Sequence, residues 1–258
     1  MRYAVLSRFE KLDYACNEAM NTLCTNLEFS GRNVKKIMFT SCRPQEGKSF
    51  LTLNMMRTLA GLGKRVVLVD CDLRRSMLES RYVSMIEGEK LGMTHYLAGQ
   101  CQAEDIVYQT NIQNAYLVMV GRDVANSLQL LSTPLLRQLL DQLAESFDYV
   151  LVDAPPVGTI IDAALIAKDC DGIVFVVSSS LISRRELIDS VNQLRKTETP
   201  ILGTVLNKVE FDSSTAKKYY YKSYYTYYYK KGYDTKNGKP EKARVKTTKK
   251  KPVHDDRP

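Results

Sequence analysis

A short loop between an apolar run and a helical pattern constrains this chain more than any other feature. The apolar residues 37–40 predict a buried strand, a turn covers 41–47, and Lys48 and Ser49 open a helix. A strand, a loop, Gly-Lys-Ser and a helix in this order are typical of a phosphate-binding P-loop. Backbone N–H groups of the loop and of the helix N-terminus then form an anion site.

The loop residues have distinct expected roles in holding a nucleotide. Lys48 can reach the β- and γ-phosphates, and the Ser49 hydroxyl can ligate Mg²⁺. The usual P-loop pattern has glycine where this chain has Cys42. Gly-Lys-Ser alone also fits a surface turn, so the interpretation depends on the rest of the chain. The predicted nucleotide-binding residues of the loop are Ser41, Cys42, Arg43, Pro44, Gln45, Glu46, Gly47, Lys48, Ser49 and Phe50.

Strand-like and helix-like segments alternate after the loop. The alternation predicts an α/β, P-loop NTPase-like domain over 1–212, with a mostly parallel sheet and helices on both faces. Its residues 1–34 are expected to be an N-terminal helical segment, with a helix over 10–29. The predicted strands are 35–40, 66–69, 116–120, 149–152, 172–177 and 201–206, and the other predicted helices are 49–62, 132–147, 160–167 and 183–195.

Polar residues follow the predicted strands at their carboxyl ends, where such sheets bind ligands. Asp153 follows an apolar run in the layout of a Walker B strand, whose carboxylate holds Mg²⁺, although an aspartate can also cap the next turn. Asp70 and Asp72 are two residues apart on an extended chain, so both side chains are expected on one side. One can serve the metal while the other accepts a proton, unless they form a solvated acidic strand end. Asn207 can pair with the edge of adenine, or can belong to a turn.

The positive charge of the chain is concentrated at its C-terminal end. The 258 residues have a formal net charge of +8. Residues 208–258 hold 15 Lys and Arg against 6 Asp and Glu, a net +9, and the remainder has −1. Because residues 213–258 contain no Leu, Ile, Met or Phe, a disordered tail is predicted there. A basic tail suits an acidic partner, a nucleic acid or an anionic membrane surface.

The tail also holds nine of the sixteen tyrosines of the chain. They have no aliphatic partners with which to build a core. Two interpretations remain: an aromatic and basic arm for nucleic acid, or a cluster of phosphate acceptors. These tyrosines are Tyr219, Tyr220, Tyr221, Tyr224, Tyr225, Tyr227, Tyr228, Tyr229 and Tyr233.

Cysteine, histidine and hydropathy patterns favour a cytoplasmic protein. The six cysteines include no C-x-x-C pair and fit reduced, mostly buried thiols. The two histidines are isolated, so zinc is not expected, and His95 is interpreted as a surface or cap residue. No apolar run reaches the roughly 18–20 residues of a membrane span, and the first residues lack the apolar core of a signal peptide.

Together these motifs resemble the BY-kinases, the bacterial tyrosine kinases of capsule and exopolysaccharide synthesis. The resemblance covers nearly all of residues 10–233 and rests on TSCRPQEGKS, VVLVDCDLRR, YVLVDAPP, LGTVLNKV and the terminal tyrosines. It implies an ATP- and Mg²⁺-dependent protein-tyrosine kinase that autophosphorylates its tyrosine cluster and regulates polysaccharide synthesis and export. By this likeness Lys48 and Ser49 bind the phosphates and Mg²⁺. Asp72 and Asp153 support the metal, and Asp70 is the base for the tyrosine hydroxyl.

The chain resembles the Gram-positive type of the family, in which the kinase is a separate, soluble chain. This resemblance also implies partners. Such a kinase is activated at the inner face of the plasma membrane by the cytoplasmic end of a transmembrane adaptor of the polysaccharide co-polymerase kind. A cognate tyrosine phosphatase and self-association for transfer between subunits are expected, and nucleic acid is not. The family's E-x-x-R-x-x-R oligomerisation motif reads Glu18, Asn21 and Cys24 here, so both arginines are missing.

A different class of protein fits part of the pattern. Partition and division-site ATPases with a deviant Walker motif act as positional switches on DNA or membranes. They carry a lysine at the position of Arg43 and lack a tyrosine-rich tail. Formation of phosphotyrosine from ATP separates the two classes.

Overall fold

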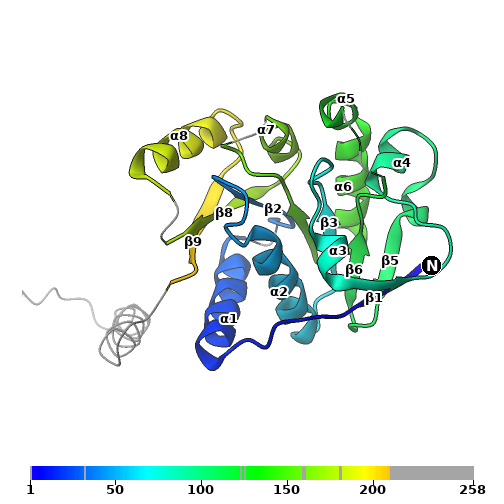
Figure 1. The fold of residues 1–258 in the computed structure, drawn as a ribbon, viewed down its shortest axis with the longest axis horizontal. Helices are drawn as coiled ribbons and strands as arrows, with labels where there is room; N and C mark the ends of the chain where they lie inside the picture. The colour runs from blue at the N-terminus through cyan, green and yellow to red at the C-terminus, as the bar shows by residue number, and fades with distance from the viewer. Residues whose placement is uncertain are drawn as a thin grey trace, which may run out of the picture. The chain divides into compact units, whose positions relative to one another are not determined.

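In the computed structural model a single mixed sheet organises the described residues, which are 2–31, 33–122, 124, 126–158, 161–179 and 182–209 (Figure 1). Its strands are β1 (Arg2–Leu6), β2 (Lys36–Ser41), β3 (Val66–Asp70), β4 (Val83–Ile86), β5 (Val107–Thr110), β6 (Ala115–Val118), β7 (Tyr149–Asp153), β8 (Gly172–Ser178) and β9 (Ile201–Asn207). They are ordered β4-β1-β5-β6-β3-β7-β2-β8-β9. Only the β1–β4 and β5–β6 pairs are antiparallel in this sheet, which confirms the mostly parallel arrangement.

Helices cover both faces of this sheet (Figure 1). The first three pack on one face, and the later ones pack on the other. They are α1 (Tyr14–Phe29), α2 (Lys48–Gly61), α3 (Leu78–Tyr82), α4 (Met93–Leu97), α5 (Ser127–Leu131), α6 (Leu135–Ser146), α7 (Asp162–Ala167) and α8 (Arg184–Arg195), with a short 3₁₀ turn η1 (Ala103–Asp105).

The central strands alternate between the two layers. In β2, Met38 belongs to one core, and Ile37 and Phe39 belong to the other. Since each face of the sheet is covered, both sets of side chains are apolar, and the strand reads as a continuous apolar run. The register of β3 and β7 also sets Asp70 directly beside Asp153. The predicted runs at 35–40, 66–69, 149–152 and 172–177 are therefore confirmed as β2, β3, β7 and β8.

The N-terminal segment differs from the expected helical segment over 1–34. It begins with β1, which lies between β4 and β5 in the sheet. Helix α1 begins at Tyr14 rather than residue 10, because the Asp13 carboxylate caps it by accepting from the Cys16 amide at 2.7 Å. On this helix Glu18 and Asn21 are exposed, whereas Cys24 is buried with its Sγ 4.0 Å from Met55 Sδ. Position 24 therefore faces the core.

Residues 71–114 hold elements that the sequence did not predict, among them α3, β4, α4 and β5. His95 lies in α4 and is buried rather than at the surface. Its Nδ1 accepts from the Gly92 amide at 3.2 Å, so the expectation of a cap is confirmed.

Two of the predicted helices have different bounds in the structure. The helix predicted over 132–147 begins at Leu135 with Pro134 in the N-cap position, and the hydroxyls of Ser132 and Thr133 donate to carbonyl oxygens of the preceding turn. The helix predicted over 49–62 ends at Gly61, and Leu62 beyond it is 58% exposed.

Met1–Val209 forms one compact unit. The predicted tail over 213–258, with its nine tyrosines, lies outside the described residues, and the boundary at residue 212 stays a prediction. Within the described ranges, no helix has the length and apolar character needed to cross a bilayer.

Candidate active site

The P-loop joins the end of β2 to the start of α2, and two of its residues have left-handed backbones. Gly47, the N-cap residue of α2, has φ 91°, and Gln45 has φ 66°. Cys42 is not among the described residues with positive φ. The usual glycine at position 42 is therefore not required by backbone conformation, which explains how cysteine is accommodated there.

Glu46 braces the loop from inside. Its buried Oε2 accepts from the amides of Cys42 at 2.7 Å and Arg43 at 3.1 Å. Its Oε1 is also buried and has no hydrogen-bond partner among the described residues. The side chain of this predicted nucleotide-binding residue thus holds the turn in shape.

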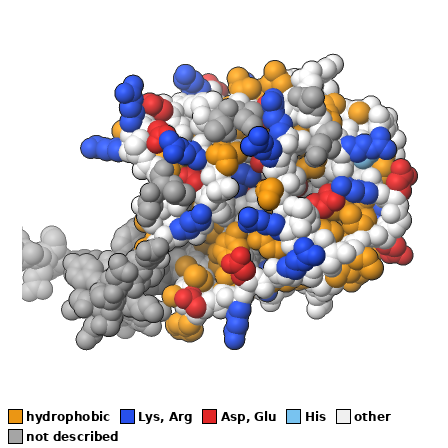
Figure 2. All heavy atoms as spheres, viewed as in Figure 1, with side chains coloured by type: hydrophobic (Ala, Val, Ile, Leu, Met, Phe, Trp, Pro, Cys, Tyr) orange, Lys and Arg blue, Asp and Glu red, His pale blue; other side chains and the backbone are white. Residues whose placement is uncertain are grey.

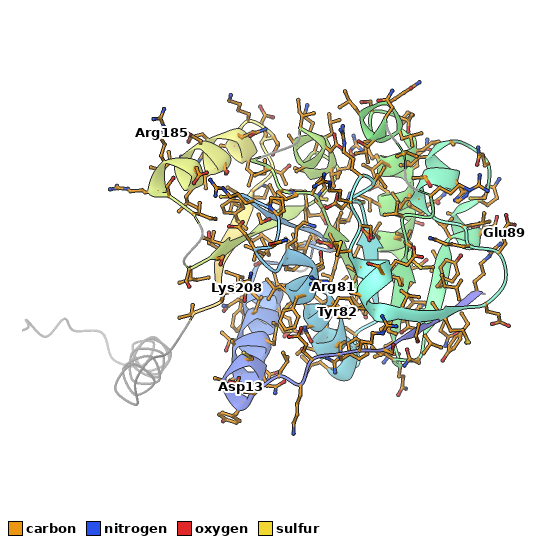
Figure 3. All side chains as sticks on the ribbon, in the orientation of Figure 1. Asp13, Arg81, Tyr82, Glu89, Arg185 and Lys208 are labelled. Carbon is orange, nitrogen blue, oxygen red and sulfur yellow. The ribbon has the colours of Figure 1, made fainter. Side chains whose placement is uncertain are left out.

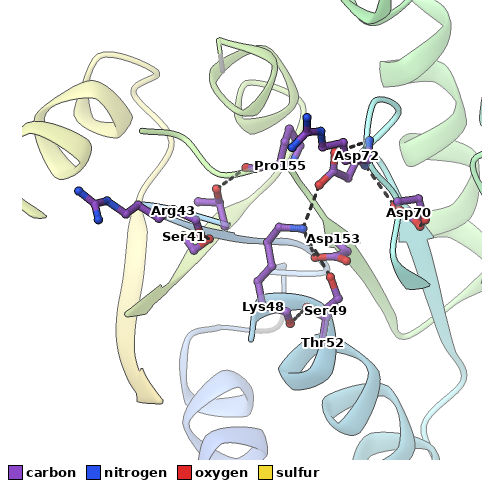
Figure 4. A network of polar contacts seen from close by, with 12 residues as sticks. Ser41, Arg43, Lys48, Ser49, Thr52, Asp70, Asp72, Asp153 and Pro155 are labelled. Atoms are coloured by element: carbon purple, nitrogen blue, oxygen red, sulfur yellow. Dashed lines mark hydrogen bonds and ion pairs between the residues drawn. The ribbon is translucent and has the colours of Figure 1, made fainter. Parts of the chain in front are cut away.

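Lys48 stands at the centre of a buried polar cluster (Figure 4). Its Nζ lies 3.3 Å from Asp72 Oδ2, 3.3 Å from Asp153 Oδ1 and 3.5 Å from Ser49 Oγ. Burial alone would lower the pKa of Lys48, but the carboxylates of Asp153 and Asp72 raise it above its ordinary value. The structure therefore brings together the residues predicted to handle phosphate and metal.

Asp70 belongs to the same cluster but has different partners. Its carboxylate accepts from the Ser76 hydroxyl and, at 3.1 Å, from the Asp72 amide. Burial, followed by the negative charge of Asp153, raises the pKa of Asp70 to about 7. Asp70 and Asp72 therefore lie at one site, as expected. Asp72 forms an ion pair with the Lys48 ammonium, and Asp70 has a pKa near neutral pH.

The donor atoms fit Mg²⁺ bound together with phosphate. Ser49, Asp72 and Asp153 offer one hydroxyl and two carboxylates around Lys48 Nζ. In the part of the chain that the structure describes, no three His, Cys, Asp or Glu residues form a ready-made metal cage. Mg²⁺ usually takes only one or two protein carboxylates and completes its shell with water and substrate phosphates. The oxygen-only set at this loop has that composition.

The end of β9 also contacts the loop. Asn207, predicted to pair with adenine, donates from Nδ2 to the Glu46 carbonyl at 2.8 Å. Lys208, which the sequence did not single out, donates from Nζ to the Gln45 carbonyl at 2.6 Å. A Cβ on Gly47 would lie 2.1 Å from Asn207 Nδ2, so only glycine fits there.

A second network beside the carboxylates was missed from the sequence. Arg74 Nε donates to Ser127 Oγ at 2.7 Å and to Asp162 Oδ2 at 3.0 Å. The Asp162 side chain is 2% exposed, and Ser127 also donates to it. These contacts tie the segment after β3 to the first residues of α5 and α7. In the sequence, only the position of Arg74, two residues after Asp72 in the charged segment that follows β3, could have indicated that it belongs to the site.

Arg43 has a partner on another helix. It forms an ion pair with Glu186, the residue whose carboxylate accepts from the Ser183 amide at the N-terminus of α8. More widely, Lys and Arg side chains are interspersed with Asp and Glu on the face drawn in Figure 2.

Comparison with known proteins gives a consistent match over the described domain. The family model described as AAA domain matches residues 34–204. The tyrosine-protein kinase CpsD of Streptococcus agalactiae is 33% identical over 198 residues, which are 77% of this chain and 86% of that protein. The solved BceF tyrosine kinase domain is 30% identical with a TM-score of 0.66, covering 75% of this chain and 76% of that one.

Two further proteins define the range of the likeness. The putative tyrosine-protein kinase EpsB of Ralstonia solanacearum is 30% identical, and the match covers 88% of this chain but 30% of EpsB. The septum site-determining protein MinD of Pyrococcus horikoshii, solved with Mg-ADP, has a TM-score of 0.57 at 22% identity, over 71% of this chain and 76% of that chain. At that identity the likeness to MinD shows the fold alone.

Proposed function

The chain belongs to the family of bacterial tyrosine-protein kinases that includes CpsD, and from this membership we propose that it transfers the γ-phosphoryl group of ATP to protein tyrosines. The observation that carries the proposal is the convergence of Lys48, Asp72 and Asp153 beside the P-loop. We further propose that the acceptors are the nine tail tyrosines and that the reaction regulates capsular or exopolysaccharide synthesis and export.

Lys48 supplies the positive charge for the transferred group. In the structure its ammonium binds two carboxylates, and on nucleotide binding it exchanges them for oxygens of the β- and γ-phosphates. Ser49, Asp72 and Asp153 would hold Mg²⁺, which when bound neutralises the charge that develops on the phosphate oxygens. The loop from Ser41 to Phe50 encloses the polyphosphate, and Asn207 Oδ1 accepts from the amino group of adenine.

Asp70 acts as the general base. It lies next to the residues that handle the phosphate, and its carboxylate accepts from the Asp72 amide and the Ser76 hydroxyl. A base works best when its pKa is near the operating pH, and burial brings Asp70 into that range. Its carboxylate takes the proton of the acceptor tyrosine as the hydroxyl oxygen attacks the γ-phosphorus.

Incubating the purified chain with ATP and Mg²⁺ should produce phosphotyrosine, detected with a phosphotyrosine antibody and located by mass spectrometry. Chelating Mg²⁺ should abolish the signal, because the two carboxylates and Ser49 need the cation to hold the phosphates. ATP hydrolysis without any phosphotyrosine would instead support the positional-switch ATPase. No observation on this chain beyond the shared fold favours that second function.

Phosphorylation should occur mainly between subunits. Transfer requires the tyrosine hydroxyl to lie in line with the γ-phosphate. The tail of the same molecule is attached by a short segment that restricts this geometry, whereas the tail of a second molecule is not restricted in this way. The experiment mixes an inactive full-length Lys48→Met chain with an active chain truncated after Asp212. The inactive chain should become labelled, at an initial rate that rises with concentration. An unlabelled inactive chain, with concentration-independent labelling of the wild type, would mean transfer within one molecule.

The kinase is proposed to work beside a membrane partner, at the cytoplasmic face of the plasma membrane. In EpsB the matched segment is 30% of a longer chain, which supports a kinase unit that works together with additional protein. We propose that a separate transmembrane adaptor of the polysaccharide co-polymerase kind supplies that protein here. A tyrosine phosphatase would reverse the reaction. Self-association uses contacts other than the missing arginines at positions 21 and 24.

A further inference from the structure

Two consecutive residues, Asn207 and Lys208, cross the P-loop where the last strand leaves the sheet, and we refer to them as the strap. Figure 3 labels Lys208 at this position. Ser179, at the end of β8, holds the strap: its amide donates to the Asn207 carbonyl at 2.9 Å, and its hydroxyl donates to the Lys208 carbonyl at 2.7 Å. The strap is thereby fixed to the sheet, and its two side chains extend to the loop.

Both side chains bind backbone carbonyls of the loop. Lys208 Nζ donates to the Gln45 oxygen at 2.6 Å, and Asn207 Nδ2 donates to the Glu46 oxygen at 2.8 Å. A trans peptide is planar, and its C=O and N–H point in opposite directions. Holding the carbonyls of Gln45 and Glu46 on one side therefore directs the N–H groups of Glu46 and Gly47 to the other side. The strap sets the orientation of two consecutive donors in a loop whose donors bind anions.

The loop needs such support because its conformation is costly. Gln45 has φ 66°, a region where a residue with a Cβ is strained by roughly 1–2 kcal/mol. Glu46 braces the loop from inside but binds the amides of Cys42 and Arg43, so it does not hold the peptides on either side of itself. Among the described hydrogen bonds, the strap alone holds the carbonyls of Gln45 and Glu46.

We propose that Lys208 and Asn207 are positioning residues, which orient the amides of Glu46 and Gly47 toward the polyphosphate of the nucleotide. This inference rests on the proposed nucleotide-binding function. It assigns Lys208 a role that needs no contact with the nucleotide. Loss of the Lys208 contact should therefore weaken the binding of ligands that carry phosphates and should not change the binding of the base.

The test compares Lys208→Met with the wild type by isothermal titration with Mg-ADP and with adenosine. Mg-ADP should bind about tenfold more weakly to the variant, which corresponds to about 1.4 kcal/mol. Adenosine should bind both proteins equally. Lys208→Arg keeps a donor that can reach the carbonyl and should recover most of the affinity. Lys168→Met, at an exposed lysine after α7, is the matched control and should change nothing.

Two further readouts separate positioning from simple charge. The loss in Lys208→Met should persist at high salt, because a short hydrogen bond is screened less than a distant charge. In phosphotyrosine formation the variant should show a raised KM for ATP and a retained kcat. Unchanged Mg-ADP affinity, an equal loss for adenosine, or a loss that disappears at high salt would each overturn the proposal.

The binding and phosphotyrosine measurements distinguish failure of the kinase proposal from failure of the strap proposal. A wild type that binds Mg-ADP through Lys208 but makes no phosphotyrosine leaves the strap standing and removes the kinase function. A wild type that binds no Mg-ADP overturns both. Asn207→Ala serves only as a supporting variant, because Asn207 is also proposed to contact adenine.

Discussion

Lys48→Met should abolish phosphotyrosine formation and also weaken the fold. Loss of a charge aimed at the transferred group costs about 10²–10³-fold in rate or more. The ammonium is also the cation bound to Asp72 and Asp153, whose side chains are 10% and 2% exposed. Removing one partner of a buried ion pair typically costs about 3–5 kcal/mol, because a charge is left uncompensated. Denaturant unfolding of the variant without Mg²⁺ measures this loss.

Mg²⁺ should restore much of the stability of Lys48→Met without restoring activity. The cation offers the two carboxylates a new positive partner, whereas the phosphate groups still lack the ammonium. Lys64→Met is the control, since Lys64 pairs at 3.1 Å with Glu28 and both side chains are well exposed. Such pairs contribute at most about 1 kcal/mol. A Lys48→Met protein as stable as the control variant would contradict the buried cluster, and normal phosphotyrosine would falsify the role of the loop.

Asp70→Asn should make the protein more stable above neutral pH and less active. The pKa of Asp70 is about 7 in the fold against 3.8 for an ordinary aspartate, so the folded state holds its proton more tightly. As pH rises from about 4 to about 7, the unfolded chain releases this proton first, and the native state loses stability. Above pH 7 the penalty is complete. Asparagine carries no charge and avoids it.

The expected gain at pH 8 without Mg²⁺ is about 1–4 kcal/mol, the range found when buried ion pairs are replaced by uncharged residues of similar volume. It should vanish below about pH 4 and shrink when Mg²⁺ neutralises the cluster. Asp189→Asn, in an exposed pair with Arg185, should change stability by less than about 0.5 kcal/mol at either pH. Unfolding curves of both variants at pH 8 and at about pH 4 test this expected difference in stability.

The activity of Asp70→Asn gives an independent readout. A base acts on the acceptor hydroxyl, so kcat for phosphotyrosine should fall by about 10²–10⁴-fold while Mg-ADP affinity changes little. Asp72→Ala should mainly weaken Mg²⁺-dependent nucleotide binding. If Asp70→Asn mainly lost nucleotide affinity and kept kcat, the roles of Asp70 and Asp72 would have to be exchanged.

The central strands and the polar cluster around Lys48 were predictable because each has a local signal. β2, β3, β7 and β8 are covered on both faces, so they are continuous apolar runs in the sequence. Parallel strands bring their carboxyl ends to one edge, and this places Asp70, Asp72 and Asp153 near the P-loop without any knowledge of the tertiary structure. The fold class and the polar cluster around Lys48 followed from the same pattern.

The remaining features lacked such a signal. β4 has only four residues, two of them exposed, so its side chains show no run that distinguishes it from a loop. In the strap, Lys208 contacts Gln45, which is 163 positions away in the sequence. The residues near Lys208 in the sequence do not indicate this partner. His95 was interpreted as a surface or cap residue, and its burial was missed because an isolated polar residue gives no indication of burial. Such contacts depend on the folded arrangement and not on local sequence.

The position of β1 within the sheet has a consequence for biosynthesis. Ala4 pairs with Ile86 on one side and with Thr110 on the other, so residues 2–6 lack at least one of their two partner strands until both segments have left the ribosome. At about 5–20 residues per second this interval lasts on the order of 5–20 s. During translation the P-loop strand β2 and the strand β3 are made before β1 can be completed on either side. The segment RYAVL thus stays open to chaperones or to misassembly while much of the domain is still being synthesised.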